Sequence, residues 1–560
     1  MNPSVKVFFG LIGGLAMFLY GMNCMSEALQ KTAGERMKKI LGFLTKNAVM
    51  GAVAGALVTA VLQSSSATTV MVIGFVSAGL MTLPQGISVI FGANIGTTMT
   101  AQLMAIKLSN YIYPIIFIGF LVNFIAKKEK SKNIGLAIFS FGLLFEGIEI
   151  MGHVMKPLAT SPIFLNAIEQ VAQTPILGIA LGTLMTLVVQ SSSATIAVLQ
   201  NFASQAGPDG VHSVIGLTGA IPILLGDNIG TTITALLASI GQSVNAKRTA
   251  LAHSFFNISG SIVFACLIPL FAQVVTTISP QGREIDVISR QIANAHTMFN
   301  VICTCIWLPL LPLMVKIVTT IVRGSEKKVV AEEQPQFLDD NVLEQPAAAI
   351  MLVRRETRRS ADFVKQIIEV MTAELLDNKS AEADFTKSYQ HFKSLNTAVC
   401  KYINDLFSRG SMTGEQSQET SLLLYINYNL GRIEDRCSEI IEVKNKLLSR
   451  KDSLSPDAMK ELSYCCEAIA SLFEQTMNTV EAEDLDLANE IVMIRDNVHA
   501  SQLDFKRAHL ERIKNKVCDP VSHADYSGLL YNLDRIVDNC ANIAEDLLVS
   551  KKSVLAQKAK

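Results

Sequence analysis

The hexapeptide Gln-Ser-Ser-Ser-Ala-Thr occurs twice in this chain, at residues 63–68 and again at residues 190–195. The first copy interrupts an apolar, small-residue segment that spans residues 51–77. An amide and three hydroxyls are costly in such surroundings unless protein, water or a ligand satisfies their hydrogen bonds. In a single copy, serines of this kind are most simply explained as contacts between membrane helices. Because the hexapeptide recurs unchanged within a larger repeat, we interpret the two copies as parts of a binding site.

The duplication extends well beyond the hexapeptide. A second motif, Gly-Ala-Asn-Ile-Gly-Thr-Thr at residues 92–98, returns as Gly-Asp-Asn-Ile-Gly-Thr-Thr at residues 226–232. The second motifs lie slightly farther apart in the chain than the hexapeptides do, and an insertion in the loop at residues 206–212 accounts for the difference. A repeat of this length determines the architecture of a chain. It predicts two related halves, at about residues 5–127 and 133–242.

Charged residues are distributed unevenly along the chain. Half of the 560 residues are hydrophobic, 17% are charged, and the mean hydropathy is +0.35. The charges are sparse up to residue 322 and dense after residue 325. The pattern predicts an all-α protein that consists of a polytopic membrane domain followed by a soluble helical domain. We expect the membrane domain at residues 1–325, with two further helices at 248–322 after the repeats, a linker at 326–348, and the soluble domain at 349–560.

Net charge and cysteine content exclude some other classes of protein. The net charge of −1 gives no electrostatic reason to expect a nucleic-acid partner. None of the ten cysteines forms a Cys-x-x-Cys pair, so we expect free thiols in a reduced compartment. The first apolar run, residues 5–29, lacks an obvious small-residue cleavage site and is interpreted as a retained transmembrane helix.

The basic residues indicate which side of the membrane each connection occupies. The four densest segments should all lie in the cytoplasm; they are residues 31–46, 127–132, 247–248 and 323–328. We interpret each hexapeptide unit as a re-entrant hairpin and each second motif as a single broken crossing. The first repeat then crosses the membrane three times, at about residues 5–29, 84–106 and 111–126. An odd number of crossings inverts the second repeat and places the N-terminus outside.

Inverted repeats with interrupted helices near the membrane midplane are typical of secondary transporters. The N-termini of half-helices present backbone N–H groups and partial positive charge to an anion. Serine hydroxyls can donate to an anion or accept around a cation, and neutral hard oxygen ligands suit Na+. From the residues alone we predict a site for a small oxyanion together with Na+ or H+.

One difference between the repeats is chemically important, because Ala93 in the first becomes Asp227 in the second. A carboxylate at membrane depth is a functional candidate, and we expect Asp227 to couple an ion or to face the pathway. Glu146 and Glu149 are weaker candidates that could equally be interhelical hydrogen-bond partners.

Two histidines occur in related sequences after the repeats, Ala-His-Ser-Phe-Phe-Asn at residues 252–257 and Ala-His-Thr-Met-Phe-Asn at residues 295–300. Either histidine could be a ligand. We interpret both as polar residues that pack helices together.

The doubled Gln-Ser-Ser-Ser motif within inverted repeats resembles the type II sodium–phosphate cotransporters and their bacterial relatives, over about residues 5–322. The resemblance implies a protein of the bacterial plasma (inner) membrane that couples Na+ to transport of inorganic phosphate. It implies that phosphate lies between Gln63, Ser64, Ser65 and Ser66 and Gln190, Ser191, Ser192 and Ser193. It implies Na+ ligands among Gln63, Ser66, Thr68, Asn94, Thr97, Thr98, Gln190, Ser193, Thr195, Asp227, Asn228, Thr231 and Thr232.

The soluble half is also duplicated. Residues 429–437 parallel residues 532–540, and the apolar spacing throughout is helical. We therefore expect two tandem three-helix units. This half resembles the PhoU family of phosphate-regulatory bundles, whose acidic pairs are associated with metal binding. The resemblance implies a possible divalent metal at Asp534 and Asp538, with Asp435 as the remnant of a pair whose first position is Gly431. It also makes a homodimer or a regulatory protein partner plausible, with the domain in the cytoplasm.

Several other functions compete with coupled phosphate transport. A hydrolase that uses Ser64–Ser66 would need a nucleophile elbow and an adjacent histidine, and the sequence contains neither, so we do not expect an enzyme. A passive channel would use the same oxygens without coupling. A transporter of another small oxyanion, driven by Na+ or H+, and a PhoU-like phosphate-signalling protein with a membrane anchor are the remaining alternatives.

Overall fold

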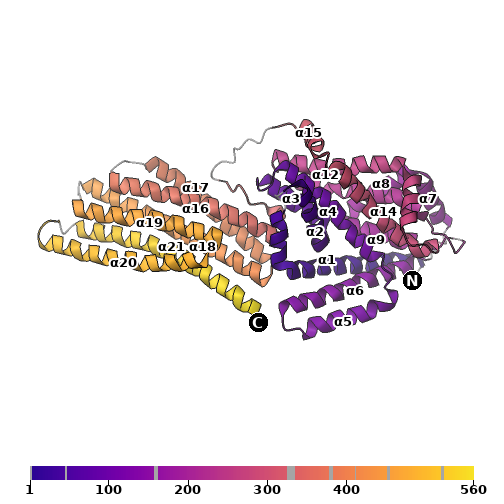
Figure 1. Ribbon diagram of the computed structural model, residues 1–560, viewed down its shortest axis with the longest axis horizontal. Coiled ribbons are helices and arrows are strands. Elements are labelled where there is room, and N and C mark those ends of the chain that lie inside the picture. The colour runs from indigo at the N-terminus through magenta and orange to yellow at the C-terminus, as the bar shows by residue number, and fades with distance from the viewer. Residues whose placement is uncertain are drawn as a thin grey trace. The chain divides into compact units, whose positions relative to one another are not determined.

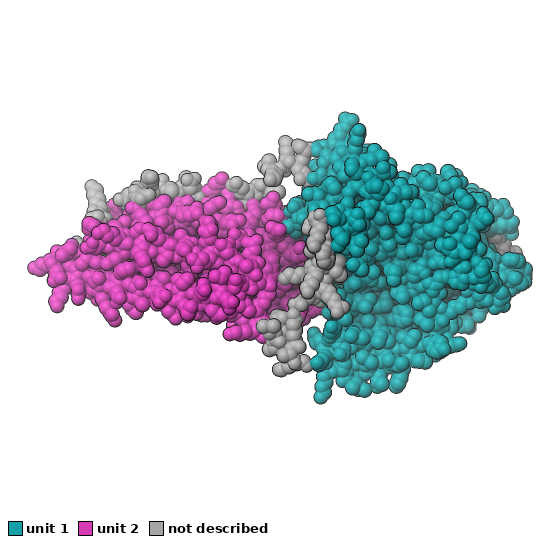
Figure 2. All heavy atoms as spheres, in the orientation of Figure 1, with its two compact units in different colours: residues 1–326 teal, residues 327–560 magenta. Residues whose placement is uncertain are grey.

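The computed structural model describes residues 3–43, 47–156, 162–207, 209–324, 334–377, 382–409, 412–450, 454–518 and 522–559. The chain separates into two compact units, Met1–Glu326 and Lys327–Lys560 (Figure 2). Among the described residues there is no strand, and the extended pairing is limited to one isolated bridge between Ala206 and Ser213. The protein is all-α, as the sequence predicts (Figure 1).

The described part of the first repeat supplies six helical segments to the membrane unit, and its hexapeptide separates two short ones. The segments are α1 (Pro3–Phe43), α2 (Ala48–Leu62), α3 (Ser65–Ser77), α4 (Leu83–Met104), η1 (Ser109–Tyr111) and α5 (Ile112–Ile125). The expected boundary near residue 30 is absent, because α1 continues to Phe43 without a proline to interrupt it.

The second repeat follows the same order with two additional breaks, one between α6 and α7 and one between α10 and α11. Its helices are α6 (Glu129–Met155), α7 (Pro162–Gln173), α8 (Pro175–Val189), α9 (Ser192–Ala203), α10 (Gly216–Gly230) and α11 (Thr232–Ala238). Helices α6 and α7 together correspond to α1, and the sequence between them carries Pro157. Proline disfavours continuation of a helix, which explains why this repeat has two helices where the first has one.

The structure corrects the expectation of a broken crossing at the second motif of the first repeat, because α4 runs without interruption through residues 92–98. The glycines there allow close packing instead of freeing the backbone. A Cβ atom on Gly92 would lie 1.8 Å from the carbonyl oxygen of Ala52 in α2. Gly226 has the same role, since its Cβ would lie 2.0 Å from the carbonyl oxygen of Ile179 in α8. Only the second repeat has a break in this motif, at Thr231 between α10 and α11.

The described region after the repeats contains four helices rather than the two expected at 248–322. They are α12 (Val244–Cys266), α13 (Ile268–Ile278), α14 (Glu284–Trp307) and α15 (Leu311–Ile321). Each of the two breaks immediately precedes a helix that has proline in its first turn, Pro269 in α13 and Pro312 in α15. Proline is tolerated there and disrupts a helix interior.

The membrane unit has helix contacts within each repeat, between the two repeats, and between the repeats and the later helices. Helix α1 packs along α6, α2 packs on α4, and α8 packs on α10. Helices α12 and α14 contact both α4 and α10. Four described helices are long and apolar enough to cross a membrane, and six are if each bent helix pair counts as one span. The bends are 77° between α4 and α5 and 86° between α14 and α15.

The second unit is, over its described residues, a bundle of six long helices, in agreement with two three-helix units (Figure 1). They are α16 (Pro346–Asp377), α17 (Glu382–Ser408), α18 (Gly414–Arg450), α19 (Pro456–Ala482), α20 (Leu485–Lys514) and α21 (Ser522–Ala559). Residues 326–333 of the expected linker lie outside the described residues. The rest of it is folded, because η3 (Asp340–Val342) buries Val342 and the Tyr402 hydroxyl donates to the Asp339 carbonyl at 2.7 Å.

Candidate functional site

The first hexapeptide forms the turn between two half-helices. Gln63 ends α2 in the left-handed conformation, with φ of 52°, and its N–H donates to the carbonyl of Thr59 at 2.7 Å. Ser64 then caps α3, because its Oγ accepts from the N–H of Ala67 at 3.2 Å. A side-chain bond between Thr59 and Thr68, with 2.9 Å between their hydroxyl oxygens, links the two half-helices. The predicted re-entrant hairpin therefore has a defined turn.

The second hexapeptide repeats this geometry closely. Gln190 ends α8 with φ of 53°, and its N–H donates to the carbonyl of Thr186 at 2.8 Å. Ser191 caps α9 by accepting from the N–H of Ala194 at 3.3 Å. Thr186 and Thr195 form the matching bond at 3.1 Å. Sequence identity in the motif thus corresponds to identity of backbone conformation.

Each motif therefore presents the N-terminus of a half-helix at the point where the chain turns. The serine that caps each helix uses its hydroxyl within the turn, so Ser64 and Ser191 offer less to a ligand than their neighbours do. The first N–H groups of α3 and α9, from residues 65–66 and 192–193, have no intrahelical acceptor, as in any α-helix. Such an N-terminus favours an anion.

The two glutamines differ in their surroundings although their backbones match. Gln63 is buried, and its Oε1 accepts from the hydroxyl of Thr100 in α4 at 2.8 Å. Gln190 is exposed. The residue that corresponds to Thr100 is Thr234 in α11, which donates instead to Ser66 of the first repeat at 3.2 Å. This bond joins the first motif directly to the second repeat.

In each repeat, the asparagine of the second motif forms a hydrogen bond with a side chain of α12 or α14. The Oδ1 atom of Asn94 lies 3.1 Å from Nε2 of His253 in α12. Asn228 accepts from the amide of Asn300 in α14 at 3.5 Å. The helix-packing role that we expect for His253 therefore has a specific partner. His296 is buried, and neither ring nitrogen has a protein partner among the described residues.

The threonines of the second motif divide into two groups. Thr98 donates to the carbonyl of Ile95 in its own helix, and Thr232, the first residue of α11, donates to the carbonyl of Ile229 in α10, each at 2.8 Å. Thr97 and Thr231 are also buried. Thr97 and Thr98 lie on α4, Thr232 lies on α11, and Thr231 lies at the break between α10 and α11.

Asp227 is completely buried next to the second hairpin. Its Oδ1 accepts from the hydroxyl of Thr186 at 2.6 Å, whereas its Oδ2 has no partner in the described structure. A buried carboxylate oxygen without a partner is costly, so this position favours a cation or a proton. The sequence analysis did not single out Thr186, although its place one turn before the motif and its counterpart Thr59 could have indicated it.

Glu146 and Glu149 both lie on α6 and accept hydrogen bonds from a neighbouring segment. Glu146 accepts from the hydroxyl of Tyr113 at 3.4 Å, and Glu149 accepts from the hydroxyl of Ser109 at 3.0 Å. Both hydrogen bonds join α6 to the η1–α5 segment. The two glutamates are thus hydrogen-bond partners between helical segments, which is the alternative given for them in the sequence analysis.

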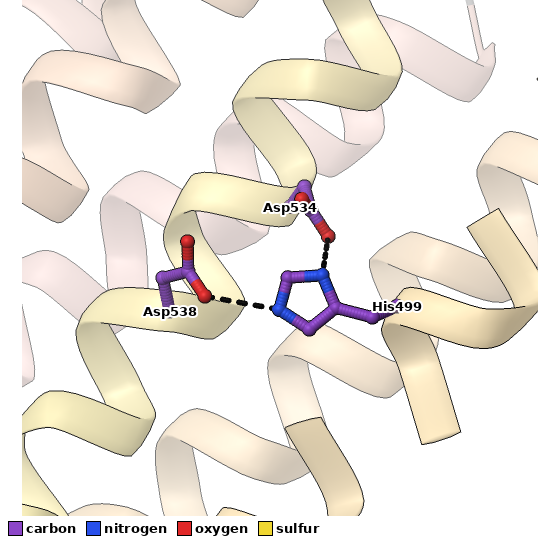
Figure 3. A group of neighbouring side chains, drawn as sticks. All are labelled: His499, Asp534 and Asp538. Carbon is purple, nitrogen blue, oxygen red and sulfur yellow. Dashed lines mark hydrogen bonds and ion pairs between the residues drawn. The ribbon is translucent and has the colours of Figure 1, made fainter. Parts of the chain in front are cut away.

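A second candidate site lies in the helical bundle (Figure 3). His499 of α20 lies between two carboxylates of α21, with its Nδ1 at 2.9 Å from Asp534 and its Nε2 at 3.0 Å from Asp538. One potential ligand atom from each residue lies within 4.8 Å of the others, a spacing that one metal ion can bridge. Burial raises the pKa of Asp534 above its ordinary range. A nitrogen and two carboxylates suit zinc, iron or manganese.

The first three-helix unit has lost this arrangement. The alignment that pairs Asn429 with Asn532 also pairs Asn396 with His499, Gly431 with Asp534 and Asp435 with Asp538. The structure agrees, because a Cβ atom on Gly431 would lie 3.3 Å from the amide nitrogen of Asn396. Asp435 is exposed and belongs to no group of three potential ligands among the described residues.

Comparison with known proteins accounts for both units. A family model described as Na+/Pi-cotransporter matches residues 17–153 and again residues 155–292, and a PhoU-domain model matches residues 465–547. "Uncharacterized protein YqeW" of Bacillus subtilis (strain 168) is 32% identical over 266 residues, which are 48% of this chain and 84% of that protein. The chain belongs to the Na+/Pi-cotransporter family.

Two further relatives carry functional names. "Putative inorganic phosphate export protein YjbB" of Escherichia coli (strain K12) is 22% identical over 540 residues, which are 96% of this chain and 97% of that protein. Human "Sodium-dependent phosphate transport protein 2B" is 36% identical over 98 residues, which are 17% of this chain and 14% of that protein. No solved structure matches the chain. This Na+/Pi-cotransporter family member is therefore a membrane protein with a C-terminal PhoU domain.

Proposed function

We propose that this protein is a secondary active transporter that couples Na+ movement to the transport of inorganic phosphate across a bacterial plasma membrane. Phosphate binds at the N-termini of α3 and α9, through N–H groups and hydroxyls of Ser65, Ser66, Ser192 and Ser193. Gln63 and Gln190 border these two half-sites. The helical bundle lies in the cytoplasm.

One observation carries this proposal. The two hexapeptides, one in each repeat, adopt the same αL-glutamine turn and the same serine cap, with φ of 52° and 53° at the two glutamines. Non-glycine residues rarely adopt positive φ, so the turn is a specific conformation that recurs with the motif. It creates two half-helix N-termini, which are the usual means of binding a phosphate group through backbone N–H groups.

The coupling ion is assigned to the second repeat. The unpartnered Oδ2 of Asp227 provides a charged ligand, and the hydroxyls of Thr186 and Thr195 lie beside it. Neutral oxygens from Asn228, Thr231 and Ser193 complete a hard-ligand environment that suits Na+. The first repeat has alanine in place of this carboxylate, which supports unequal roles for the two halves in coupling.

Labelled phosphate flux in proteoliposomes tests the function. We expect a Na+ gradient to drive phosphate accumulation and arsenate to compete better than sulfate. Phosphate is loaded inside or outside in separate experiments, because one relative is named as an export protein. Phosphate flux that does not depend on the Na+ gradient supports a channel. Phosphate flux that depends on a proton gradient supports H+ coupling. Either result contradicts the proposal. A complete lack of phosphate flux supports the membrane-anchored signalling alternative.

The PhoU domain supports a second, regulatory role. We propose that His499, Asp534 and Asp538 bind one divalent metal ion, with His499 rotating to offer a single ring nitrogen. The metal would crosslink α20 to α21, and through this domain the protein would respond to a regulatory partner or pair with a second copy. Metal analysis of the purified full chain by mass spectrometry, compared with Asp534→Asn, tests the metal, and gel filtration with light scattering tests the pairing.

A further inference from the structure

A hollow of about 230 Å³ opens in the membrane unit beside α9. Its walls come from the end of α4, from η1, from the second half of α6, from the second half of α9 and from the start of α14. A cavity that holds one water needs only about 10 to 15 Å³ of such volume, so the hollow accommodates a hydrated ion. Its walls combine parts of both repeats.

The hollow follows the helix that carries the second hexapeptide. Ala197, Gln200, Asn201 and Ser204, in α9 and at its C-terminal cap, all line it. Ser192, the first residue of α9, lies five residues before Ala197, which is about 8 Å along a helix that rises about 1.5 Å per residue. The nearest lining residue of α9 therefore lies about 8 Å along the helix from the proposed half-site at Ser192 and Ser193.

The matching segment of the first repeat is packed tightly. The alignment that pairs Gln63 with Gln190 also pairs Ile73 with Gln200, Gly74 with Asn201 and Ser77 with Ser204. Ile73 is completely buried, and Ser77 donates to Gln242 at 2.7 Å. Two polar side chains on α9 thus replace an isoleucine and a glycine on α3. Polar side chains at membrane depth are favoured where water reaches them.

Gln200 joins α9 to two neighbouring helices at the wall of the hollow. Its amide nitrogen donates to the carbonyls of Ala101 at 3.1 Å and Ser289 at 2.9 Å, which joins α9 to α4 and α14. Its Oε1 is buried and has no partner in the described structure. Because this oxygen is buried and not exposed to the hollow, it is a costly unpaired acceptor and not a ligand for a passing ion.

The formal charges that line the hollow balance at neutral pH. Lys107 pairs with Asp286 at 2.6 Å, and Glu149 lies 3.4 Å from His153. Lys156 also lines the hollow, and no carboxylate lies within ion-pair distance of it among the described residues. Two lysines thus oppose two carboxylates around the hollow, and the ammonium group of Lys156, which has no paired carboxylate among the described residues, is the group there that attracts an anion.

We propose that this hollow is an aqueous vestibule through which phosphate reaches the half-site at Ser191–Ser193, on the membrane face opposite the basic connections. This inference rests on the proposed function. Asn201 and Ser204 contact the hydrated anion as it passes, and the packed α3 segment closes the equivalent path on the cytoplasmic face. The described conformation thus admits the substrate from one side only.

Thiol accessibility in the full-length protein tests the vestibule. Ser204→Cys places a small thiol on its wall, and Ser77→Cys is the matched control on α3. A membrane-impermeant thiol reagent is applied from outside to intact cells or from the cytoplasmic face to inverted vesicles, with the wild type as the control for native cysteines. We expect outside reagent to modify Ser204→Cys and to abolish its phosphate flux, and we expect added phosphate to slow the modification. Ser77→Cys should not react from that face.

The outcomes separate this inference from the proposed function. Mass spectrometry reports modification whether or not the protein transports phosphate, and flux of the unmodified variant reports the function. The vestibule is contradicted if Ser204→Cys reacts from neither face, if it reacts only from the cytoplasmic face, or if modification leaves phosphate flux unchanged. Absence of flux in all unmodified proteins contradicts the proposed function instead.

Discussion

The two repeats of the membrane unit share a backbone design and differ in what surrounds it. Both have a glutamine with positive φ, a serine cap and a threonine pair across the hairpin. Around the first hairpin, Gln63 is buried and bonded to Thr100, and α3 is tightly packed. Around the second, Gln190 is exposed and a buried carboxylate replaces alanine. The turn that creates the half-sites is therefore the same in both repeats. The charge beside the turn and the exposure of its glutamine differ between them.

The helical bundle shows the same principle in a different setting. Its second three-helix unit places His499 between Asp534 and Asp538, and its first unit has asparagine and glycine at two of these positions. In each duplicated element, one copy thus contains the ionisable residues of a candidate site, and the other copy has uncharged residues at one or more of the corresponding positions. The following predictions exchange residues between copies to test this division.

The largest effect is expected at Asp227. Asp227→Asn keeps an acceptor for Thr186 but removes the charge, so we expect Na+-driven phosphate flux to fall about a hundredfold, which corresponds to about 2.7 kcal/mol. Flux measured against Na+ concentration checks this prediction. Ala93→Asp, the matched change in the first repeat, should not restore coupling in the double variant. Unchanged Na+ dependence in Asp227→Asn would contradict the assignment of the coupling ion to the Asp227 carboxylate.

The candidate metal ligands His499, Asp534 and Asp538 test the comparison between the two three-helix units of the bundle. We expect Asp534→Asn to lose bound metal, because a neutral amide replaces one of the two carboxylate ligands. The double variant Asn396→His and Gly431→Asp rebuilds the same residue types in the first unit and should bind a second equivalent. Metal content per chain is measured by mass spectrometry. Equal metal content in all three proteins would rule out the proposed site.

Alanine substitutions of Gln63 and Gln190 should differ in their effects on the free energy of unfolding and on phosphate transport. Gln63→Ala leaves the hydroxyl of buried Thr100 without its acceptor, which costs about 1 to 3 kcal/mol. Gln190→Ala removes an exposed side chain and should change stability by less than about 0.5 kcal/mol, while the KM for phosphate rises. Both glutamines have positive φ, so the backbone cost of alanine is common to both. Thermal unfolding in detergent together with phosphate flux checks the pair, and equal destabilisation would contradict the difference in their surroundings.

The smallest effect concerns Glu434, a buried carboxyl in the first three-helix unit where the second has Val537. Burial raises the pKa of Glu434 from 4.5 to about 7. Because the folded pKa is the higher one, the carboxyl is tolerated below about pH 4.5, and stability is lost progressively as the pH rises toward 7. Glu434→Gln should therefore stabilise the bundle above pH 7 by about 1 kcal/mol, within an upper limit of about 3 kcal/mol.

Hydrogen exchange of the α18 amides across this pH range measures the effect of Glu434→Gln. Below about pH 4.5 the variant and the wild type should exchange alike, since the wild-type carboxyl is then neutral in both states. A constant difference at every pH would indicate that packing, and not ionisation, separates the two proteins.

The turns of the membrane unit were largely predictable from sequence. A polar hexapeptide between apolar segments indicates an interrupted helix, and the structure has its breaks at Gln63 and Gln190. Proline positions could have indicated the breaks near Leu267 and Leu308, which the two expected helices at 248–322 did not include. The continuous helix α4 was not predictable in this way. Glycine permits both a break and a close contact, and only the packing of α2 against Gly92 distinguishes them.

The sequence by itself determined the duplication, the two half-helix N-termini and the loss of symmetry at Asp227, because repeats, helix breaks and charge are written in residue order. The tertiary structure decided which groups meet. His253 with Asn94, Asn300 with Asn228, and Thr234 with Ser66 are pairs whose members lie far apart in the chain. Such pairs depend on how the helices pack. The same is true of the hollow beside α9, whose walls come from distant segments and exist only once those segments have packed.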